Sequence, residues 1–194
     1  YLENDMKTEL KERIIDVAIE EYTLMGLKFT MNDIARKLGI SKKTIYTIFD
    51  SKRDVLVGIA DRYSDDFRSM QEEIERNPDL DAEQKFERIL LALPEKYYNI
   101  GLNRIYELSF KYPRQYDYLM ASVNMGWQIA ENYLREGIRN GAFDDVSIPV
   151  FMSMVKGTVS CFMRTSVLYD NDMTYEQGKL EMVRILMKGI KSDE

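Results

Sequence analysis

The chain has 194 residues, of which 45% are apolar, and a formal net charge of −6. This apolar content is sufficient for a buried core, and no apolar run approaches the roughly 20 residues that span a bilayer. We therefore expect a globular cytoplasmic protein that does not contact a membrane. A single cysteine, Cys161, excludes an intrachain disulfide, and the absence of histidine removes the common histidine-dependent catalytic and metal sites. We predict no catalytic residues, no metal site and no cofactor.

The first predicted helix covers residues 6–24. Its apolar side chains recur at intervals of three and four residues and form one inward face, whereas its charged side chains lie on the other side. Gly26 is expected to end this helix.

A second, short helix is predicted for residues 31–38. Thr30 is suited to cap it, and Asp33 stands three residues later, as in a capping box. Gly39 is expected to end the helix, because a residue without a Cβ atom readily takes the left-handed conformation of a sharp turn.

A third helix is predicted for residues 42–49, with Ser41 as its cap. Ile45 and Phe49 lie four residues apart and face inward, which leaves lysine and hydroxyl side chains on the outer face. Two short helices joined by a glycine-containing turn are typical of a helix-turn-helix, in which the second helix enters the major groove of DNA.

This segment resembles the DNA-binding segment of the TetR family of bacterial transcriptional repressors. The resemblance covers roughly the first 60 residues, and the rest of the chain agrees with the family only in its helical layout. Ile48 stands where the family usually carries histidine or tyrosine, so the phosphate contacts are expected to differ there. The matching residues are Gly26, Phe29, Thr30, Ile34, Ala35, Leu38, Gly39, Ile40, Ser41, Thr44, Ile45, Tyr46, Phe49, Ser51, Lys52 and Leu56.

The charge distribution also favours DNA binding. Residues 28–53 hold seven basic and two acidic side chains, although the whole chain is acidic. A basic patch on an acidic body is expected to approach the phosphate backbone in one orientation. Lysines and hydroxyl groups supply the predicted contacts to bases and phosphates, and the resemblance implies that Tyr46 lies against the backbone. The predicted DNA-binding residues are Thr30, Ser41, Lys42, Lys43, Thr44, Tyr46, Thr47 and Lys52.

The remaining chain is also predicted to be helical, which makes the fold all-α. A long helix begins at Ser51 and ends near residue 76, before Pro78. We expect further helices over residues 81–98, interrupted at Pro94, 100–110 and 113–140. The chain is thus predicted to divide into a three-helix DNA-binding domain, residues 1–50, and a helical effector-binding and dimerisation domain, residues 51–194.

The last two predicted helices cover residues 147–168 and 174–190. The first is apolar on more than one side, and such a helix must be covered on both sides. Pairing both helices with their copies in a second subunit would form a four-helix interface, so we predict a homodimer.

The resemblance implies a small-molecule effector in the C-terminal domain. Aromatic and methionine side chains at helical spacing suit an adaptable apolar cavity, although they are more often plain core. Polar side chains within apolar helix faces would orient the ligand. The predicted effector-binding residues are Arg104, Tyr106, Glu107, Phe110, Asn124, Trp127, Phe162 and Arg164. For Cys161 we expect a small buried side chain rather than a thiol sensor.

Two hypotheses of different classes remain open. The leading one is a dimeric, ligand-responsive transcriptional regulator, predicted to be a repressor, which binds palindromic operator DNA and is released by its effector. The alternative is a helical interaction or ligand-carrier protein that retains the helix-turn-helix only as a fold element.

Overall fold

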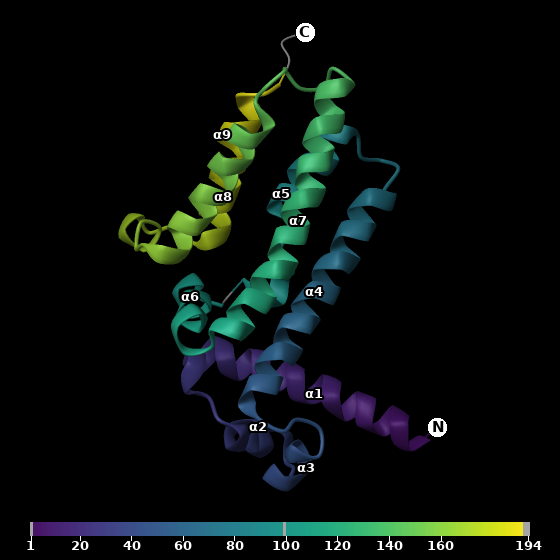
Figure 1. Cartoon of the computed structure of the whole chain (residues 1–194), viewed down its shortest axis with the longest axis vertical. Helices are drawn as coiled ribbons and strands as arrows, with labels where there is room; N and C mark the ends of the chain where they lie inside the picture. The colour runs from purple at the N-terminus through teal and green to yellow at the C-terminus, as the bar shows by residue number, and fades with distance from the viewer. Residues whose placement is uncertain (1, 99, 192–194) are drawn as a thin grey trace. The chain divides into compact units, whose positions relative to one another are not determined.

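The structure is a computed structural model that describes residues 2–98 and 100–191, without the side chains of residues 2–4, 102 and 103. The described chain is all-α, as the sequence predicts (Figure 1). Its only β-type pairing within those ranges is an isolated antiparallel bridge between Phe143 and Lys191. None of the described helices combines the length and the apolar character that crossing a bilayer requires.

The described chain forms two compact units. The first contains residues up to 64 together with 100–119, and the second contains residues 65–98 and 120–191. The predicted boundary after residue 50 falls inside the first unit, which also includes a helix from the middle of the chain. That boundary was a functional one, between DNA binding and effector binding, and it stays a prediction.

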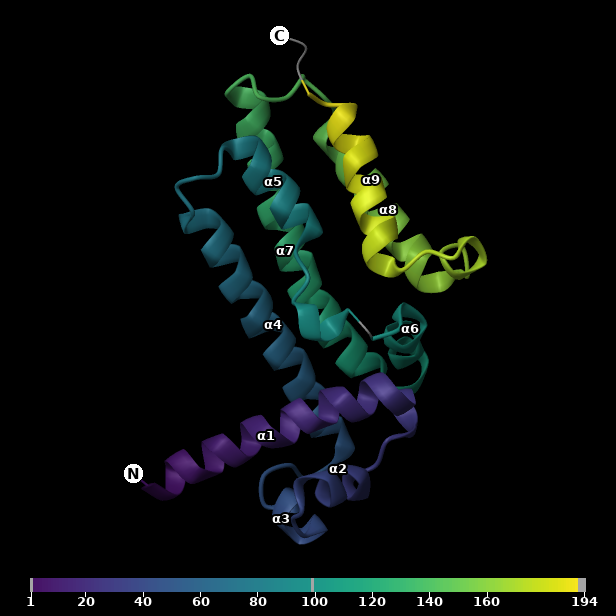
Figure 2. The ribbon, with the colours of Figure 1, turned by 180° about the vertical axis from the view of Figure 1, so that it is seen from behind.

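The first unit contains α1 (Leu2–Met25), the short 3-10 helix η1 (Gly26–Lys28), α2 (Met31–Leu38), α3 (Lys42–Tyr46) and α6 (Leu102–Lys111). It also contains the first parts of α4 (Lys52–Arg76) and α7 (Pro113–Arg139). The views from both sides show α2 and α3 together on one side of α1 (Figures 1 and 2). The buried side chains of this unit include Ile14, Ala18, Tyr22, Phe29, Ile34, Ile45, Phe49 and Val55.

The second unit contains the remaining parts of α4 and α7, together with α5 (Ala82–Leu91), α8 (Ile148–Arg164) and α9 (Tyr175–Lys188). Two 3-10 helices, η2 (Glu95–Tyr97) and η3 (Tyr169–Asn171), lie in its connections. Helices α8 and α9 lie side by side (Figure 2). Its core is built around Phe86, Leu90, Leu134, Phe143, Val155 and Val183.

Four predicted helix boundaries are wrong. The first helix begins at Leu2 rather than at residue 6. The helix predicted for residues 42–49 is α-helical only from Lys42 to Tyr46, and residues 47–48 continue with tighter i to i+3 hydrogen bonds. The helix over residues 81–98 ends at Leu91, because the segment before Pro94 is extended. The helix over residues 147–168 ends at Arg164, since Thr165 has an extended conformation.

Candidate nucleic-acid interface

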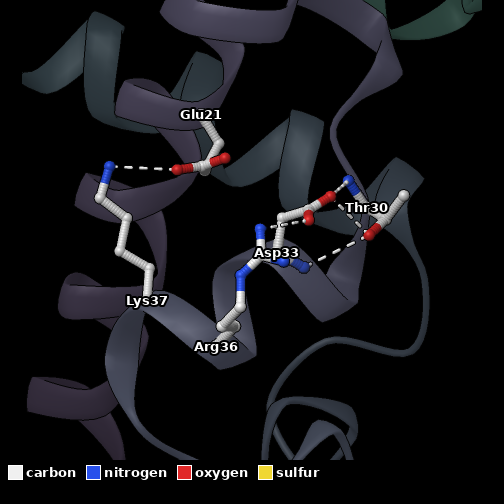
Figure 3. Close-up of polar contacts among 5 residues, drawn as sticks. All are labelled: Glu21, Thr30, Asp33, Arg36 and Lys37. Carbon is white, nitrogen blue, oxygen red and sulfur yellow. Dashed lines mark hydrogen bonds and ion pairs between the residues drawn. The ribbon is translucent and has the colours of Figure 1, made fainter.

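Helix α2 begins with the predicted capping box (Figure 3). The backbone N–H of Asp33 donates to Thr30 Oγ1 at 3.3 Å, and the backbone N–H of Thr30 donates to Asp33 Oδ2 at 2.9 Å. The Thr30 hydroxyl also donates to Asp33 Oδ2, at 2.7 Å, and this bond holds the pKa of the Asp33 carboxyl below its usual value. Gly39 ends the helix with a φ of 67°, in the left-handed region, so the predicted turn is confirmed.

Two basic side chains of α2 are engaged in ion pairs (Figure 3). The Arg36 guanidinium lies 3.0 Å from Asp33 Oδ1. The Lys37 ammonium lies 2.8 Å from Glu20 and 3.0 Å from the buried Glu21, both on α1, and these hydrogen bonds raise the pKa of Lys37. Lys37 therefore fastens α2 to α1 and is less available to an external phosphate.

Helix α3 presents unpaired cations on its outer side. Ser41 caps it by accepting a hydrogen bond from the Thr44 N–H at 3.0 Å, and Ile45 is completely buried beneath it. Lys42 and Lys43 are exposed, and neither has an ion-pair partner among the described residues. The Lys42 ammonium lies 5.7 Å from the centre of the Tyr46 ring. The buried Ile45 thus lies beneath two lysines that have no ion-pair partner among the described residues.

The hydroxyl groups of this segment are held close to the helix. Ser41 Oγ lies 2.8 Å from Thr44 Oγ1, and the Thr47 hydroxyl donates to the Thr44 carbonyl at 2.7 Å. Tyr46 is 43% exposed, so its hydroxyl group is open to solvent. The structure therefore brings the predicted residues Ser41 to Thr47 together on one short element.

Lys52, at the start of α4, differs from the lysines of α3. Its ammonium donates to the carbonyls of Leu27 and Phe29, each at 2.6 Å, and lies 4.1 Å from the centre of the Phe29 ring. Burial, and secondarily the charge of Lys111, lowers the pKa of Lys52. This geometry gives Lys52 a structural role in holding the segment before α2, and its contact with phosphate stays a prediction.

The structure divides the seven basic residues of segment 28–53 into two groups. Arg36, Lys37 and Lys52 are held by internal partners, whereas Lys28, Lys42, Lys43 and Arg53 are exposed and have none among the described residues. Sequence reasoning missed Lys28 and Arg53 as candidate phosphate contacts. The signal for Lys28 was the lack of an acidic residue within four positions in the sequence, whereas Arg53 stands between Asp50 and Asp54 and carries no such signal.

Four predicted effector-binding residues lie on α6, in the first unit. The Arg104 guanidinium donates to the carbonyls of Tyr22 at 3.0 Å, of Leu24 at 3.2 Å and of Thr23, in the last turn of α1. The Tyr22 hydroxyl in turn donates to the Arg104 carbonyl at 2.7 Å. Arg104 therefore caps α1, which has no basic residue in its own last turn.

Of the other three predicted residues of α6, Glu107 and Phe110 are exposed and Tyr106 is partly buried. Phe110 is 71% exposed and meets the Tyr106 ring edge to face, with the ring centres 5.1 Å apart. Glu107 is exposed, and its charge adds to the effect of burial in raising the pKa of Tyr22.

The remaining four predicted effector-binding residues lie in the second unit. Trp127 is partly buried against the core, whereas Asn124 and Arg164 are exposed. Phe162 meets the Tyr175 ring edge to face, with the ring centres 6.4 Å apart. Binding of an effector by either group of four stays a prediction. The expectation that Cys161 is buried is wrong for the single chain, because its side chain is exposed.

No group of acidic, cysteine or histidine side chains in the described ranges is arranged to hold a metal ion. The exposed lysines above the buried side of α3 make the basic, capped helix pair of α2 and α3 the candidate site, and comparison with known proteins agrees with it. Residues 14–59 match the family described as "Bacterial regulatory proteins, tetR family".

Known proteins also resemble the chain over nearly its full length. The HTH-type transcriptional regulator YvaF of Bacillus subtilis (strain 168), itself uncharacterised, is 23% identical over 95% of this chain and 97% of its own. A putative transcriptional regulator from Saccharomonospora viridis, solved with choline, has a TM-score of 0.76 and 18% identity over 96% of this chain and 100% of its own. FadR from Bacillus subtilis, solved with stearoyl-CoA, has a TM-score of 0.68 and 21% identity over 92% and 98% of the two chains. Residues 14–59 thus match the tetR family of bacterial regulatory proteins, and the fold of the whole chain is similar to those of solved transcriptional regulators.

Proposed function

We propose that this protein is a ligand-responsive transcriptional repressor that binds palindromic operator DNA as a homodimer. The observation that carries the proposal is the pair of exposed lysines on α3, Lys42 and Lys43, which lie above the buried Ile45 and have no ion-pair partner among the described residues. A helix whose inner side is fixed by packing presents its outer side chains in a defined geometry, which reading bases in the major groove requires.

The surface of the last two helices supports the homodimer. Val150, Met154, Gly157 and Cys161 follow one another at intervals of four, three and four residues, so they share one face of α8. Met154 is 53% exposed, and a Cβ atom at Gly157 would meet no heavy atom of the described chain within 4 Å. On α9, Ile185 is 57% exposed. A second copy seated on this apolar face would cover it, Cys161 included.

The proposed effector acts on the second unit. Two solved relatives in fold were crystallised with small molecules, FadR with stearoyl-CoA and the Saccharomonospora viridis regulator with choline. A ligand that binds more tightly to the DNA-incompetent state lowers the affinity for DNA. By linkage, the size of this effect is set by the ratio of the ligand's affinities for the two states. A coupling of about 1–3 kcal/mol corresponds to roughly 5- to 150-fold.

The proposal is tested with duplexes from the region upstream of the protein's own gene, by fluorescence anisotropy at several salt concentrations. We expect a palindromic duplex to bind with an affinity that falls steeply with salt, by about 0.9 logarithmic units per logarithmic unit of salt for each phosphate contact. The triple variant Lys42→Ala, Lys43→Ala, Tyr46→Ala should lose specific binding and remain a dimer by analytical ultracentrifugation.

A matched control removes two exposed cations elsewhere, through Lys156→Ala and Arg139→Ala in the second unit. This variant should bind DNA almost as the unmodified protein does, because the lost charges lie outside the helix-turn-helix. Equal affinity of the triple variant and the unmodified protein would overturn the proposal and favour the helical carrier, in which the motif is only a fold element.

A further inference from the structure

Lys179 is a buried cation that the proposed DNA interface does not use. It lies on α9 in the second unit, and its side chain is only 7% exposed. Its ammonium donates one hydrogen bond, to the carbonyl of Ala92 at 3.0 Å. An ammonium group has three N–H donors, so two remain without a hydrogen-bond partner in the described chain.

The burial of this charge is incompletely compensated. Ala92 is the C-terminal cap of α5, and the negative end of that helix offsets part of the cost of removing the ammonium from water. Burial nevertheless lowers the pKa of Lys179 to about 8, and its ammonium forms no ion pair with a carboxylate of the described residues. Buried lysines are normally paired, so a cation without a counter-charge indicates a missing anionic partner.

The surroundings of Lys179 combine a second free donor with apolar side chains. The ammonium lies 5.9 Å from the centre of the Tyr175 ring. Burial raises the pKa of the Tyr175 hydroxyl to about 12, and this hydroxyl has no hydrogen-bond partner among the described residues. Phe162 meets the Tyr175 ring edge to face.

Gly178 allows this cluster to pack closely. A Cβ atom at Gly178 would lie 2.5 Å from the Leu168 side chain and 3.4 Å from Phe162, so both side chains pack directly onto the backbone of α9 beside Lys179. The cation and the free hydroxyl therefore adjoin an apolar wall formed by the end of α8 and the connection that follows it.

We propose that Lys179 and Tyr175 bind the oxyanion head of an amphipathic organic anion, whose apolar tail lies against Phe162 and Leu168. The ammonium and the phenol are donors, and a carboxylate or phosphate oxygen accepts from them. The inference rests on the proposed function in one respect, because it gives the chemical class of the effector. Binding itself does not require DNA.

The competing explanation is that Lys179 serves only to cap α5. The two explanations predict opposite effects of Lys179→Met, which keeps the length of the side chain and removes the charge. If Lys179 is present for ligand binding, its buried charge destabilises the ligand-free protein. Its replacement should then leave the melting temperature unchanged or raise it. A lysine that is only a cap should lower the melting temperature when it is replaced.

The test measures binding to the DNA-free protein by isothermal titration calorimetry, with decanoate, decyl phosphate, decanol and decyltrimethylammonium as probes. We expect one or both anions to bind, and the neutral and cationic probes to bind at least about tenfold more weakly, because they lack the charge-assisted hydrogen bonds. Comparison of decanoate with decyl phosphate identifies the oxyanion. Lys179→Met should weaken anion binding at least about tenfold, and Tyr175→Phe should weaken it by a smaller factor.

Lys188→Met is the matched control, because Lys188 is an exposed lysine of the same helix. It should leave anion binding unchanged. The inference is overturned if neither anion binds, if decanol binds as tightly as decanoate, or if Lys179→Met lowers the melting temperature with unchanged anion affinity. If the anion binds and DNA is not released, the site stands and its role as effector site fails. If no anion binds and DNA binding is intact, the proposed function stands without this site.

Discussion

Replacement of Arg104 by methionine should detach α6 from the end of α1. Methionine retains a flexible apolar chain of similar length and lacks the guanidinium that donates to the carbonyls of Tyr22, Thr23 and Leu24. Gly26 stands next to this contact with a φ of 58°, and a Cβ atom there would lie 3.4 Å from Arg104. The last turn of α1, Gly26 and α6 therefore pack closely together.

The magnitude follows from the exposure of the bonded groups. A hydrogen bond with one charged partner contributes about 1.5–3 kcal/mol to stability where it is buried, and less where water replaces it. Leu24 is exposed and Tyr22 is buried, so the three bonds are not equivalent. We expect a total loss of about 2–3 kcal/mol, which for a chain of this size lowers the melting temperature by roughly 4–12 °C.

The assay is thermal and urea denaturation of Arg104→Met beside Arg114→Met. Arg114 is an exposed arginine of α7 in the same unit and has no partner among the described residues, so its replacement should shift the melting temperature by less than about 2 °C. Hydrogen exchange should show lost protection in the last turn of α1 only for the Arg104 variant. Equal stability and equal exchange in the two variants would refute the assignment of Arg104 as the cap of α1.

Three further predictions concern single residues. The amide nitrogen of Gln71 is buried without a hydrogen-bond partner among the described residues, so Gln71→Met should raise the free energy of unfolding by about 1 kcal/mol in urea titration, and a decrease would contradict this. Gly39→Ala should lower that free energy by about 1 kcal/mol through backbone strain alone, because the space around its Cβ position is open; no change would contradict the left-handed turn. The lowered pKa of Lys179 means that the unfolded chain binds more protons between pH 8 and 10, so stability should rise with pH there, by about 1–2 kcal/mol relative to Lys179→Met. Parallel pH profiles of the two proteins in chemical denaturation would refute this reasoning.

Local chemistry made the helix-turn-helix predictable. The cap at Thr30, the left-handed Gly39 and the buried Ile45 each follow from the properties of one residue and its neighbours in sequence, and all are present. The all-α class followed in the same way from helical periodicity. The early end of α3 after Tyr46 was not predictable from these rules, because a four-residue apolar interval also fits the tighter turn that replaces it.

Contacts between distant segments were not predictable. Arg104 was expected to face a ligand because it is a polar residue on a partly apolar helix, and that pattern does not reveal that it reaches carbonyls about 80 residues away in the sequence. Similarly, a count of charges treats Lys37, Lys43 and Lys52 alike. Only the fold shows that Lys37 meets Glu21 and that Lys52 meets backbone carbonyls, while Lys43 has no ion-pair partner among the described residues.

The composition of the first unit bears on how an effector would reach the DNA interface. The chain passes between the two units within α4, after Tyr98 and within α7. Two of these connections are continuous helices, and the third leads into α6, which Arg104 fastens to α1. Helix α6 therefore belongs to the same unit as α1, α2 and α3, whereas the proposed effector site of α8 and α9 lies in the other unit. These three connections are the covalent routes by which an effector bound in the second unit would act on the helix-turn-helix, and the bonds of Arg104 attach one of them directly to α1.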